Sequence, residues 1–151
     1  MNVQQTLAEL VAIDSVSSRS NSRIIEYLQQ RCERAGFAVK RFSYNDGNEK
    51  FNLLASIGDD QSYAELALVG HTDTVPYDPN WIEATTLTEK DGKLFGRGAC
   101  DTKGFIAAAL TAFRVNAIVR ERQTRQTAAP RTGRFVRAAD VELYEIGRAH
   151  V

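Results

Sequence analysis

Three side chains with the chemistry of metal ligands stand at two places where an apolar stretch of the sequence stops. The segment ALVGHTDTVP, residues 67–76, runs from apolar residues into His71 and Asp73. The segment LFGRGACDTKG, residues 94–104, runs through glycines to Asp101. Imidazole and carboxylate donors together suit Zn²⁺ or Co²⁺. The pattern therefore predicts that both stretches end at a shared metal site.

Each of these residues also has an ordinary structural explanation. A His-x-Asp pair on an extended strand projects to one face, and both side chains can simply bond the following loop. An aspartate ahead of a helix, such as Asp101, commonly caps it. A metal-bound histidine usually donates its second N–H to a carboxylate, so His71 and Asp73 fit either that arrangement or two direct ligands. Their occurrence together with Asp101, among glycines that permit tight turns, favours the metal site.

Helices and strands mix along residues 1–113 in the manner of an α/β layer architecture. Apolar residues at helical spacing predict helices, and alternating or continuously apolar stretches predict strands. The third strand is the most continuously apolar and is expected in the interior of the sheet. The expected helices cover residues 3–13, 24–36 and 102–114, and the expected strands cover residues 37–44, 51–58 and 64–70. A turn is expected at residues 45–48, and a turn with a short strand at residues 90–98.

The ends and faces of these helices carry their own expectations. Ser22 or Asn21 is expected to cap the second helix, and Gly36 to end it in a left-handed conformation. The third helix is rich in alanine and is expected to turn one apolar face inward. That face is expected to include, or lie close to, Phe105, Ala109, Ala112 and Phe113.

Composition limits the classes of protein to consider. The chain has 151 residues, of which 43% are hydrophobic and 25% charged, as in a globular, soluble domain. No apolar run reaches the length of a membrane span, and the first residues lack the features of a secretory signal. Cys32 and Cys100 lie far apart, which favours free thiols in the cytoplasm. Beside Asp101, Cys100 is expected to pack as a small apolar residue rather than to bind metal.

The two metal-site stretches together resemble one enzyme family. GHTDTVP, followed by DGKLFGRGACDTKGFIAA, resembles the zinc aminoacylase and carboxypeptidase family, which includes deacetylases, desuccinylases and dipeptidases. The resemblance covers residues 1–113 and implies the N-terminal part of a catalytic domain. The implied fold is a partial three-layer α/β sandwich of the zinc-exopeptidase type with a mixed sheet. His71 is implied to bind one metal ion, Asp101 to bridge two, and Asp73 to act in catalysis by orienting His71.

The resemblance also implies a reaction and its partners. The full-length protein is expected to hydrolyse the amide bond of a small-molecule N-acyl amino acid with two Zn²⁺ or Co²⁺ ions, as a homodimer. No nucleic-acid or membrane partner is expected. A desuccinylase or dipeptidase of the same family is the alternative within this class, and a non-catalytic metal-binding fragment is the alternative outside it.

Residues 114–151 differ from the rest in charge and composition. Residues 1–113 hold 15 acidic and 11 basic side chains, whereas residues 114–151 hold 4 and 8, and every base among these 8 is an arginine. An arginine-rich arm can bind nucleic acid, but this one lacks an organised patch or aromatic platforms. The final EIGRAHV is what a common short-read sequencing adapter encodes. Residues 114–151 are therefore expected to be an unrelated tail, disordered or a translation artefact, in which His150 has no function.

The tail also lacks a group that the family resemblance requires. The family places a Glu-Glu pair beyond the bridging aspartate, in which the first glutamate is the general base and the second a ligand. The corresponding region, TAAPRTGRFVR at residues 127–137, has no acidic side chain. A general base contributes typically about 10²–10⁴-fold to a rate. The 151-residue chain is therefore expected to be inactive by itself.

Overall fold

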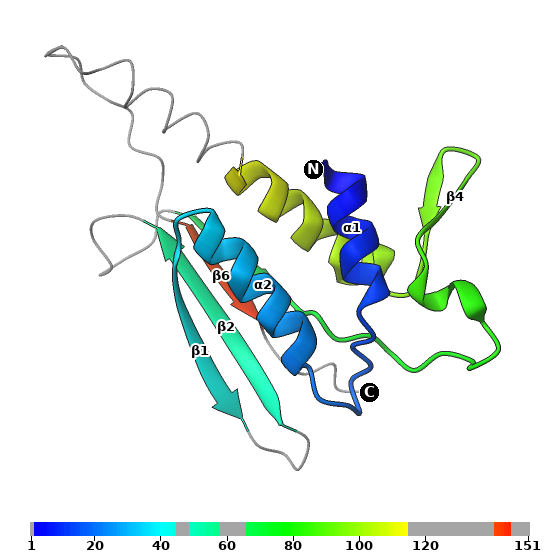
Figure 1. Cartoon of the computed structure of the whole chain (residues 1–151), viewed down its shortest axis with the longest axis horizontal. Helices are drawn as coiled ribbons and strands as arrows, with labels where there is room; N and C mark the ends of the chain where they lie inside the picture. Colours follow the sequence, from blue (N-terminus) through cyan, green and yellow to red (C-terminus); the bar gives the residue numbers. More distant parts are fainter. Residues whose placement is uncertain (1, 45–48, 58–65, 115–140, 146–151) are drawn as a thin grey trace, which may run out of the picture.

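The computed structural model describes residues 2–44, 49–57, 66–114 and 141–145, and it has the mixed helix and strand content that the sequence predicts (Figure 1). The predicted turn at residues 45–48 lies outside the described residues. In chain order the elements are α1 (Val3–Ala12), α2 (Ser22–Arg34), β1 (Ala38–Tyr44), β2 (Lys50–Ile57), β3 (Leu66–Gly70), η1 (Ile82–Thr85), β4 (Thr88–Lys90), β5 (Lys93–Phe95), η2 (Ala99–Lys103), a helix over residues 104–114, and β6 (Val141–Glu145).

The described residues form a four-stranded sheet in the order β1-β2-β6-β3. β2 is antiparallel to β1 and to β6, whereas β3 runs parallel to β6. The α/β class and the mixed sheet are thus confirmed. The predicted interior position of β3 is wrong, because β3 forms an edge of this sheet and Val69 is 45% exposed. The apolar character of β3 does not indicate an interior position in the sheet, because only one face of the strand packs on the core.

Strand β6 was not expected from the sequence. It lies between β2 and β3, with Ala55 paired to Leu143 on one side and Leu68 paired to Leu143 on the other. The arginine-rich composition around it favoured the interpretation of the whole segment as a tail. The proposed domain boundary at residue 113 stays a prediction, but one short piece beyond it completes the sheet.

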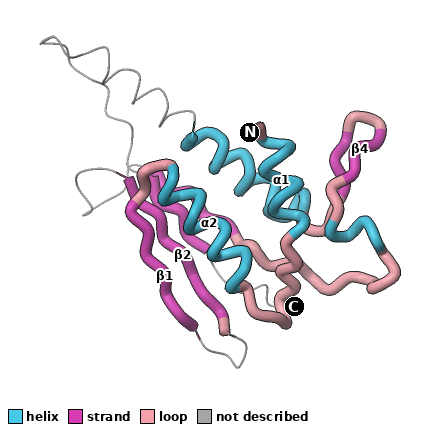
Figure 2. The backbone as a smooth tube through the Cα atoms, in the orientation of Figure 1, coloured by secondary structure: helices cyan, strands magenta, loops and turns pink. Residues whose placement is uncertain are grey.

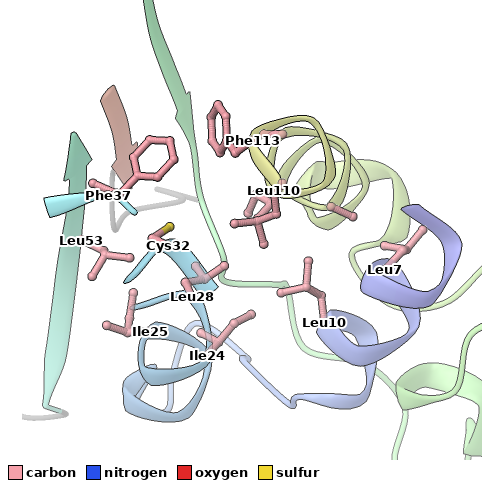
Figure 3. Packing of buried hydrophobic residues seen from close by; sticks show 14 of the residues in the cluster. Leu7, Leu10, Ile24, Ile25, Leu28, Cys32, Phe37, Leu53, Leu110 and Phe113 are labelled. Atoms are coloured by element: carbon pink, nitrogen blue, oxygen red, sulfur yellow. The ribbon is translucent and has the colours of Figure 1, made fainter. Parts of the chain in front are cut away.

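Helices cover one face of this sheet and enclose the hydrophobic core (Figure 2). α2 packs against β1 and β2, and its Ile24, Ile25, Leu28 and Cys32 are buried. Figure 3 shows these side chains between the sheet on one side and α1 and the helix over residues 104–114 on the other. On the opposite face of the sheet Phe42 is 50% exposed. The described residues therefore supply two of the three layers expected from the resemblance.

The ends of α2 agree only in part with expectation. Gly36 has a φ of +86°, which confirms the left-handed conformation after the helix. Asn21 precedes the helix but makes no side-chain cap. Its amide instead donates to the Phe51 carbonyl at 2.8 Å and accepts from the Phe51 amide at 2.9 Å. The side chain thus satisfies a β2 backbone group, which local sequence rules cannot foresee.

The helix over residues 104–114 is present, but part of its predicted face is wrong. Phe105 and Ala112 are exposed. The inward face begins one residue later, and the ring of Phe113 lies 4.8 Å from that of Phe37. Irregular backbone at Asp101 and Thr102 in η2 precedes the helix. The residues that face the core are Ile106, Ala107, Ala109, Leu110 and Phe113.

Three smaller expectations have clear outcomes. The turn and the short strand expected at residues 90–98 are present, with β5 as the strand, and β4 pairs with β5 to form a hairpin. Both cysteines are free, but Cys100 is exposed, so its predicted packing role is wrong. Cys100 lies in η2, the segment that also carries Asp101, and both residues are exposed. Within the described part of the chain, every helix is too short or too polar to cross a membrane.

The buried thiol of Cys32 should make stability depend on pH. Burial raises its pKa from 9.0 to about 12, and the charge of Glu33 adds to this. The folded chain therefore holds the thiol proton more tightly than the unfolded chain does, and this stabilisation is complete below pH 9 and lost as the pH rises towards 12. We expect the free energy of unfolding to fall between pH 8 and pH 10 by on the order of 1 kcal/mol more for the unsubstituted chain than for Cys32→Ala. Parallel pH profiles in urea denaturation would contradict this expectation.

Candidate metal centre

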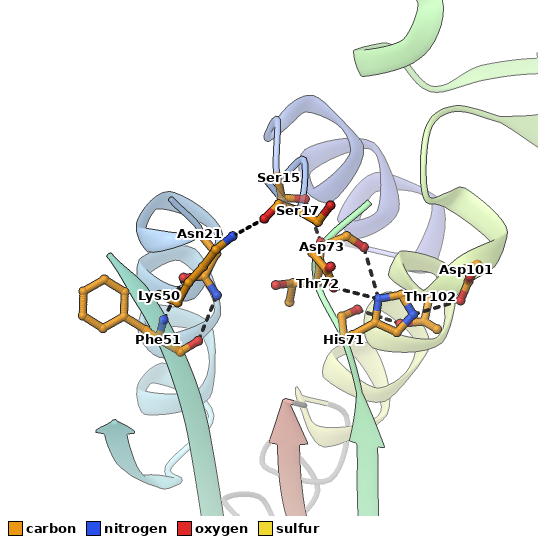
Figure 4. A network of polar contacts seen from close by, with 10 residues as sticks. All are labelled: Ser15, Ser17, Asn21, Lys50, Phe51, His71, Thr72, Asp73, Asp101 and Thr102. Carbon is orange, nitrogen blue, oxygen red and sulfur yellow. Dashed lines mark hydrogen bonds and ion pairs between the residues drawn. The ribbon is translucent and has the colours of Figure 1, made fainter. Parts of the chain in front are cut away.

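His71 and Asp101 face one another although thirty positions separate them in the sequence. His71 is the first residue after β3, and Asp101 lies in η2, just before the helix over residues 104–114. The imidazole Nε2 of His71 lies 3.0 Å from Oδ1 of Asp101. Figure 4 shows both side chains pointing toward each other across the gap between the two segments. The structure thus brings together the two residues that the sequence suggests as metal ligands.

Asp73 contacts the opposite nitrogen of the same ring. Nδ1 of His71 lies 3.1 Å from the backbone carbonyl oxygen of Asp73 and 3.1 Å from its Oδ1. Both oxygens can only accept when the carboxylate is ionised, so Nδ1 must carry the proton and donate it. Nε2 is then the nitrogen that faces Asp101. Asp73 lies behind His71 rather than beside Asp101.

The two carboxylates set the electrostatics of the ring. Burial lowers the pKa of His71, but the hydrogen bond with Asp101, the backbone hydrogen bond with Asp73 and the charges of both carboxylates together outweigh it, so the pKa is raised above 6.5. Both carboxylates therefore favour the protonated form of the ring in the metal-free protein. A divalent cation placed between Nε2 of His71 and the Asp101 carboxylate would satisfy both groups with a larger positive charge.

The donor set fits a metal ion only in part. The Asp73 side chain is 9% exposed, whereas that of Asp101 is 81% exposed, so the site is anchored on the Asp73 side and opens to solvent on the other. Across the described residues, no group of three or more His, Cys, Asp and Glu side chains is placed to hold an ion. His71 and Asp101 can therefore supply two ligands, and others must complete the coordination.

Loop contacts fix the ligand-bearing backbone. The Thr102 hydroxyl donates to the carbonyl of His71 at 2.7 Å, which joins the two segments next to their functional side chains. The Asp101 carboxylate bonds His71 rather than an amide of the following helix, and the backbone of η2 departs from helical angles at Asp101 and Thr102. The open turn leaves the Asp101 carboxylate free to meet His71.

Sequence reasoning missed three supporting residues, namely Ser15, Thr102 and Lys103. Lys103 is only 2% exposed, an unusual position for a lysine. Burial lowers its pKa to about 8, although the charge of Asp14 partly opposes this. A lysine at the start of an apolar helix was a visible signal for Lys103. Nothing in the sequence distinguishes Ser15 from the serines around it.

Comparison with known proteins identifies the family. The model of peptidase family M20/M25/M40 matches residues 67–127, which include His71, Asp73 and Asp101. An acetylornithine deacetylase of Myxococcus xanthus is 56% identical over 113 residues, covering 73% of this chain and 30% of that protein. The chain belongs to this peptidase family. An acetylornithine deacetylase of Proteus mirabilis (strain HI4320) is 42% identical over 105 residues, covering 68% of this chain and 27% of that protein.

Solved structures of M20 peptidases have the same arrangement of elements. Human carnosine dipeptidase 1 superimposes with a TM-score of 0.69 and 26% identity, over 96% of this chain and 31% of that one. A tripeptidase from Staphylococcus aureus gives a TM-score of 0.65 at 21% identity, over 95% and 35% of the two chains. The chain therefore has part of the M20 peptidase fold, and the family is generally metal-dependent. The chain spans less than a third of the length of the two acetylornithine deacetylases.

The close packing of the loop before Asp101 leads to a testable consequence. Gly98 has a φ of +76°, and an added Cβ would lie 2.7 Å from Cγ2 of Thr74 and 3.2 Å from Cδ of Lys103. Gly92 has a similar φ of +69° but nothing within 4 Å, so it is a matched control. Both alanine substitutions suffer the left-handed backbone, at about 1–2 kcal/mol. We expect Gly98→Ala to lower the free energy of unfolding in urea by about 1–3 kcal/mol more than Gly92→Ala does. Equal losses would mean that the loop yields freely.

Proposed function

We propose that a full-length protein carrying these residues hydrolyses the amide bond of an N-acyl amino acid, with N-acetylornithine as the substrate and ornithine and acetate as the products. The observation that carries the proposal is the shared imidazole of His71, with Asp101 on Nε2 and Asp73 on Nδ1. Identity to acetylornithine deacetylases over most of this chain supports the choice of substrate. The proposed role is a step of arginine biosynthesis in the cytoplasm.

His71 and Asp101 would hold the metal ion, and Asp101 would be shared with a second ion. Bound Zn²⁺ or Co²⁺ supplies a Lewis acid for the amide carbonyl and lowers the pKa of a bound water. Asp73 would orient His71 by accepting its Nδ1 proton, which leaves the lone pair of Nε2 to bind the metal ion. The resemblance to the family, not the described geometry, is the basis for a second ion and for a homodimer.

Neither His71 nor Asp101 would move the proton during hydrolysis. His71 is committed to Asp73 and Asp101, and the Asp101 carboxylate would itself be a ligand, so neither is free to act as general base. The family pattern assigns that role to a glutamate that residues 127–137 do not provide. We therefore propose that the 151-residue chain binds one metal ion weakly and does not turn over substrate.

A dipeptidase is the second candidate. The similarity to human carnosine dipeptidase 1, at 26% identity, favours it more than other activities in the family. Both reactions hydrolyse an amide bond of an amino-acid derivative, and His71 and Asp101 would serve either. His71, Asp73 and Asp101 do not distinguish an acyl group from an amino-acyl group, so the assay must include both substrates.

Metal binding tests the proposed centre directly. Titration of Co²⁺ into the purified chain should give weak binding that is lost in His71→Ala. Asp73→Asn should weaken it by about 10–100-fold, because the amide orients the ring less firmly. Asp91→Asn, on the exposed turn between β4 and β5, is the control and should bind as the unsubstituted chain does. Binding that survives His71→Ala would refute the assignment.

Hydrolysis tests the reaction. The 151-residue chain with Zn²⁺ or Co²⁺ should show no turnover of N-acetylornithine, and the full-length gene product should be active on it and slower on dipeptides. Turnover by the chain near about 1 s⁻¹, the low end for ordinary enzymes, would show that the active site is complete without a downstream glutamate. A full-length product that cleaves dipeptides alone would favour the second candidate.

A further inference from the structure

We propose that residues 13–17, hereafter the brace, fix the spacing between His71 and Asp101 by binding both ligand-bearing segments at once, with Ser15 and Lys103 as positioning residues. The proposal rests on the proposed metal centre. The brace follows α1 and lies in the interior beside the metal-site loops, as Figure 4 shows for Ser15 and Ser17. Neither Ser15 nor Lys103 is assigned a ligand or catalytic role.

The brace binds the His71 segment through a short ladder. The Ser15 hydroxyl donates to the carbonyl of Thr72 at 2.7 Å. The amide of Thr74 donates to the carbonyl of Ser15 at 3.0 Å, and the amide of Ser17 donates to the carbonyl of Thr74 at 2.9 Å. Val16 and Thr74 accordingly form a parallel bridge. These bonds hold the backbone on both sides of Asp73.

The brace binds the Asp101 segment through one buried lysine. Nζ of Lys103 donates to the carbonyl of Ile13 at 2.9 Å, and the amide of Lys103 donates to the carbonyl of Gly98 at 3.0 Å. Lys103 thus closes the loop that presents Asp101 and joins it to the end of α1. An ammonium group is costly to bury unless it is hydrogen-bonded, so a contact of this kind indicates a constraint beyond simple packing.

The contacts with the His71 segment and with the Asp101 segment, the two arms of the brace, both come from these five consecutive residues. Ser15 is 1% exposed, and its hydroxyl reaches the one residue between His71 and Asp73. Metal ligands must be held within about 0.5 Å of a working geometry by neighbours that are themselves fixed. The direct link from Thr102 to His71 spans the same gap. The brace supplies the second, interior connection, which prevents the two segments from pivoting about that link.

A paired substitution separates positioning from general stability. Ser15→Ala removes one interior hydroxyl bond. Tyr27→Phe is the matched control, because it also removes one hydroxyl bond, from Tyr27 to Glu9 between α1 and α2 at 2.7 Å. Both variants are to be compared in the full chain for urea midpoint, Co²⁺ affinity and the visible absorption spectrum of bound Co²⁺. We expect Ser15→Ala to weaken Co²⁺ binding at least about tenfold and to change the spectrum, and Tyr27→Phe to leave both within twofold.

Hydrogen exchange in the metal-free chain gives an independent readout. The Thr74 and Ser17 amides, which form the ladder, should exchange at least about tenfold faster in Ser15→Ala than in Tyr27→Phe, whereas the amides that pair β1 with β2 should not differ. If Ser15→Ala does not fold, Lys103→Met tests the other arm, since it removes the ammonium and keeps the aliphatic stem. It should weaken Co²⁺ binding to a similar degree.

The outcomes distinguish this proposal from the metal centre on which it rests. Equal Co²⁺ affinities for Ser15→Ala and Tyr27→Phe, in a chain that does bind Co²⁺, overturn the brace and leave the centre intact. Unchanged exchange at Thr74 and Ser17 also overturns it. Failure of the unsubstituted chain to bind Co²⁺ overturns the centre, and the positioning role falls with it.

Discussion

The shared imidazole of His71 is the interaction on which the rest of the site depends. One ring nitrogen is held by the buried Asp73 and the other faces the exposed Asp101. Nδ1 of the ring therefore serves to hold its orientation. Because Nδ1 is committed to donating, Nε2 is the ring nitrogen left to bind a metal ion.

Two different elements of the fold bring His71 and Asp101 together. β3 ends at Gly70 and releases His71 at the edge of the sheet, while η2 presents Asp101 just before a helix that is firmly packed in the core. Strand ends and helix starts of α/β sheets are places where loops converge on ligands. The core of α2, β2 and the helix over residues 104–114 holds these two supports in place, and the polar contacts between loops set their final spacing.

The features of this site that depend on local sequence alone could be predicted. His71, Asp73 and Asp101 stood out by chemistry and by their position at the ends of apolar stretches, and the helices and first three strands follow from their periodicity. The edge position of β3, the exposure of Cys100 and the inward residues of the last helix depend on which partners are nearby, so they were mispredicted. β6 was missed because five residues in an arginine-rich segment carry little signal. Ser15 and Lys103 act through contacts with residues far away in sequence.

The most direct test of the shared imidazole is ¹⁵N NMR of the histidine ring nitrogens during addition of Zn²⁺. The chain has two histidines, so a His71→Ala sample assigns the signals. We predict that Nδ1 of His71 stays protonated throughout, while the signal of Nε2 shifts as zinc binds. A shift of Nδ1 in place of Nε2, or a ring that does not respond to zinc, would contradict the shared-imidazole arrangement.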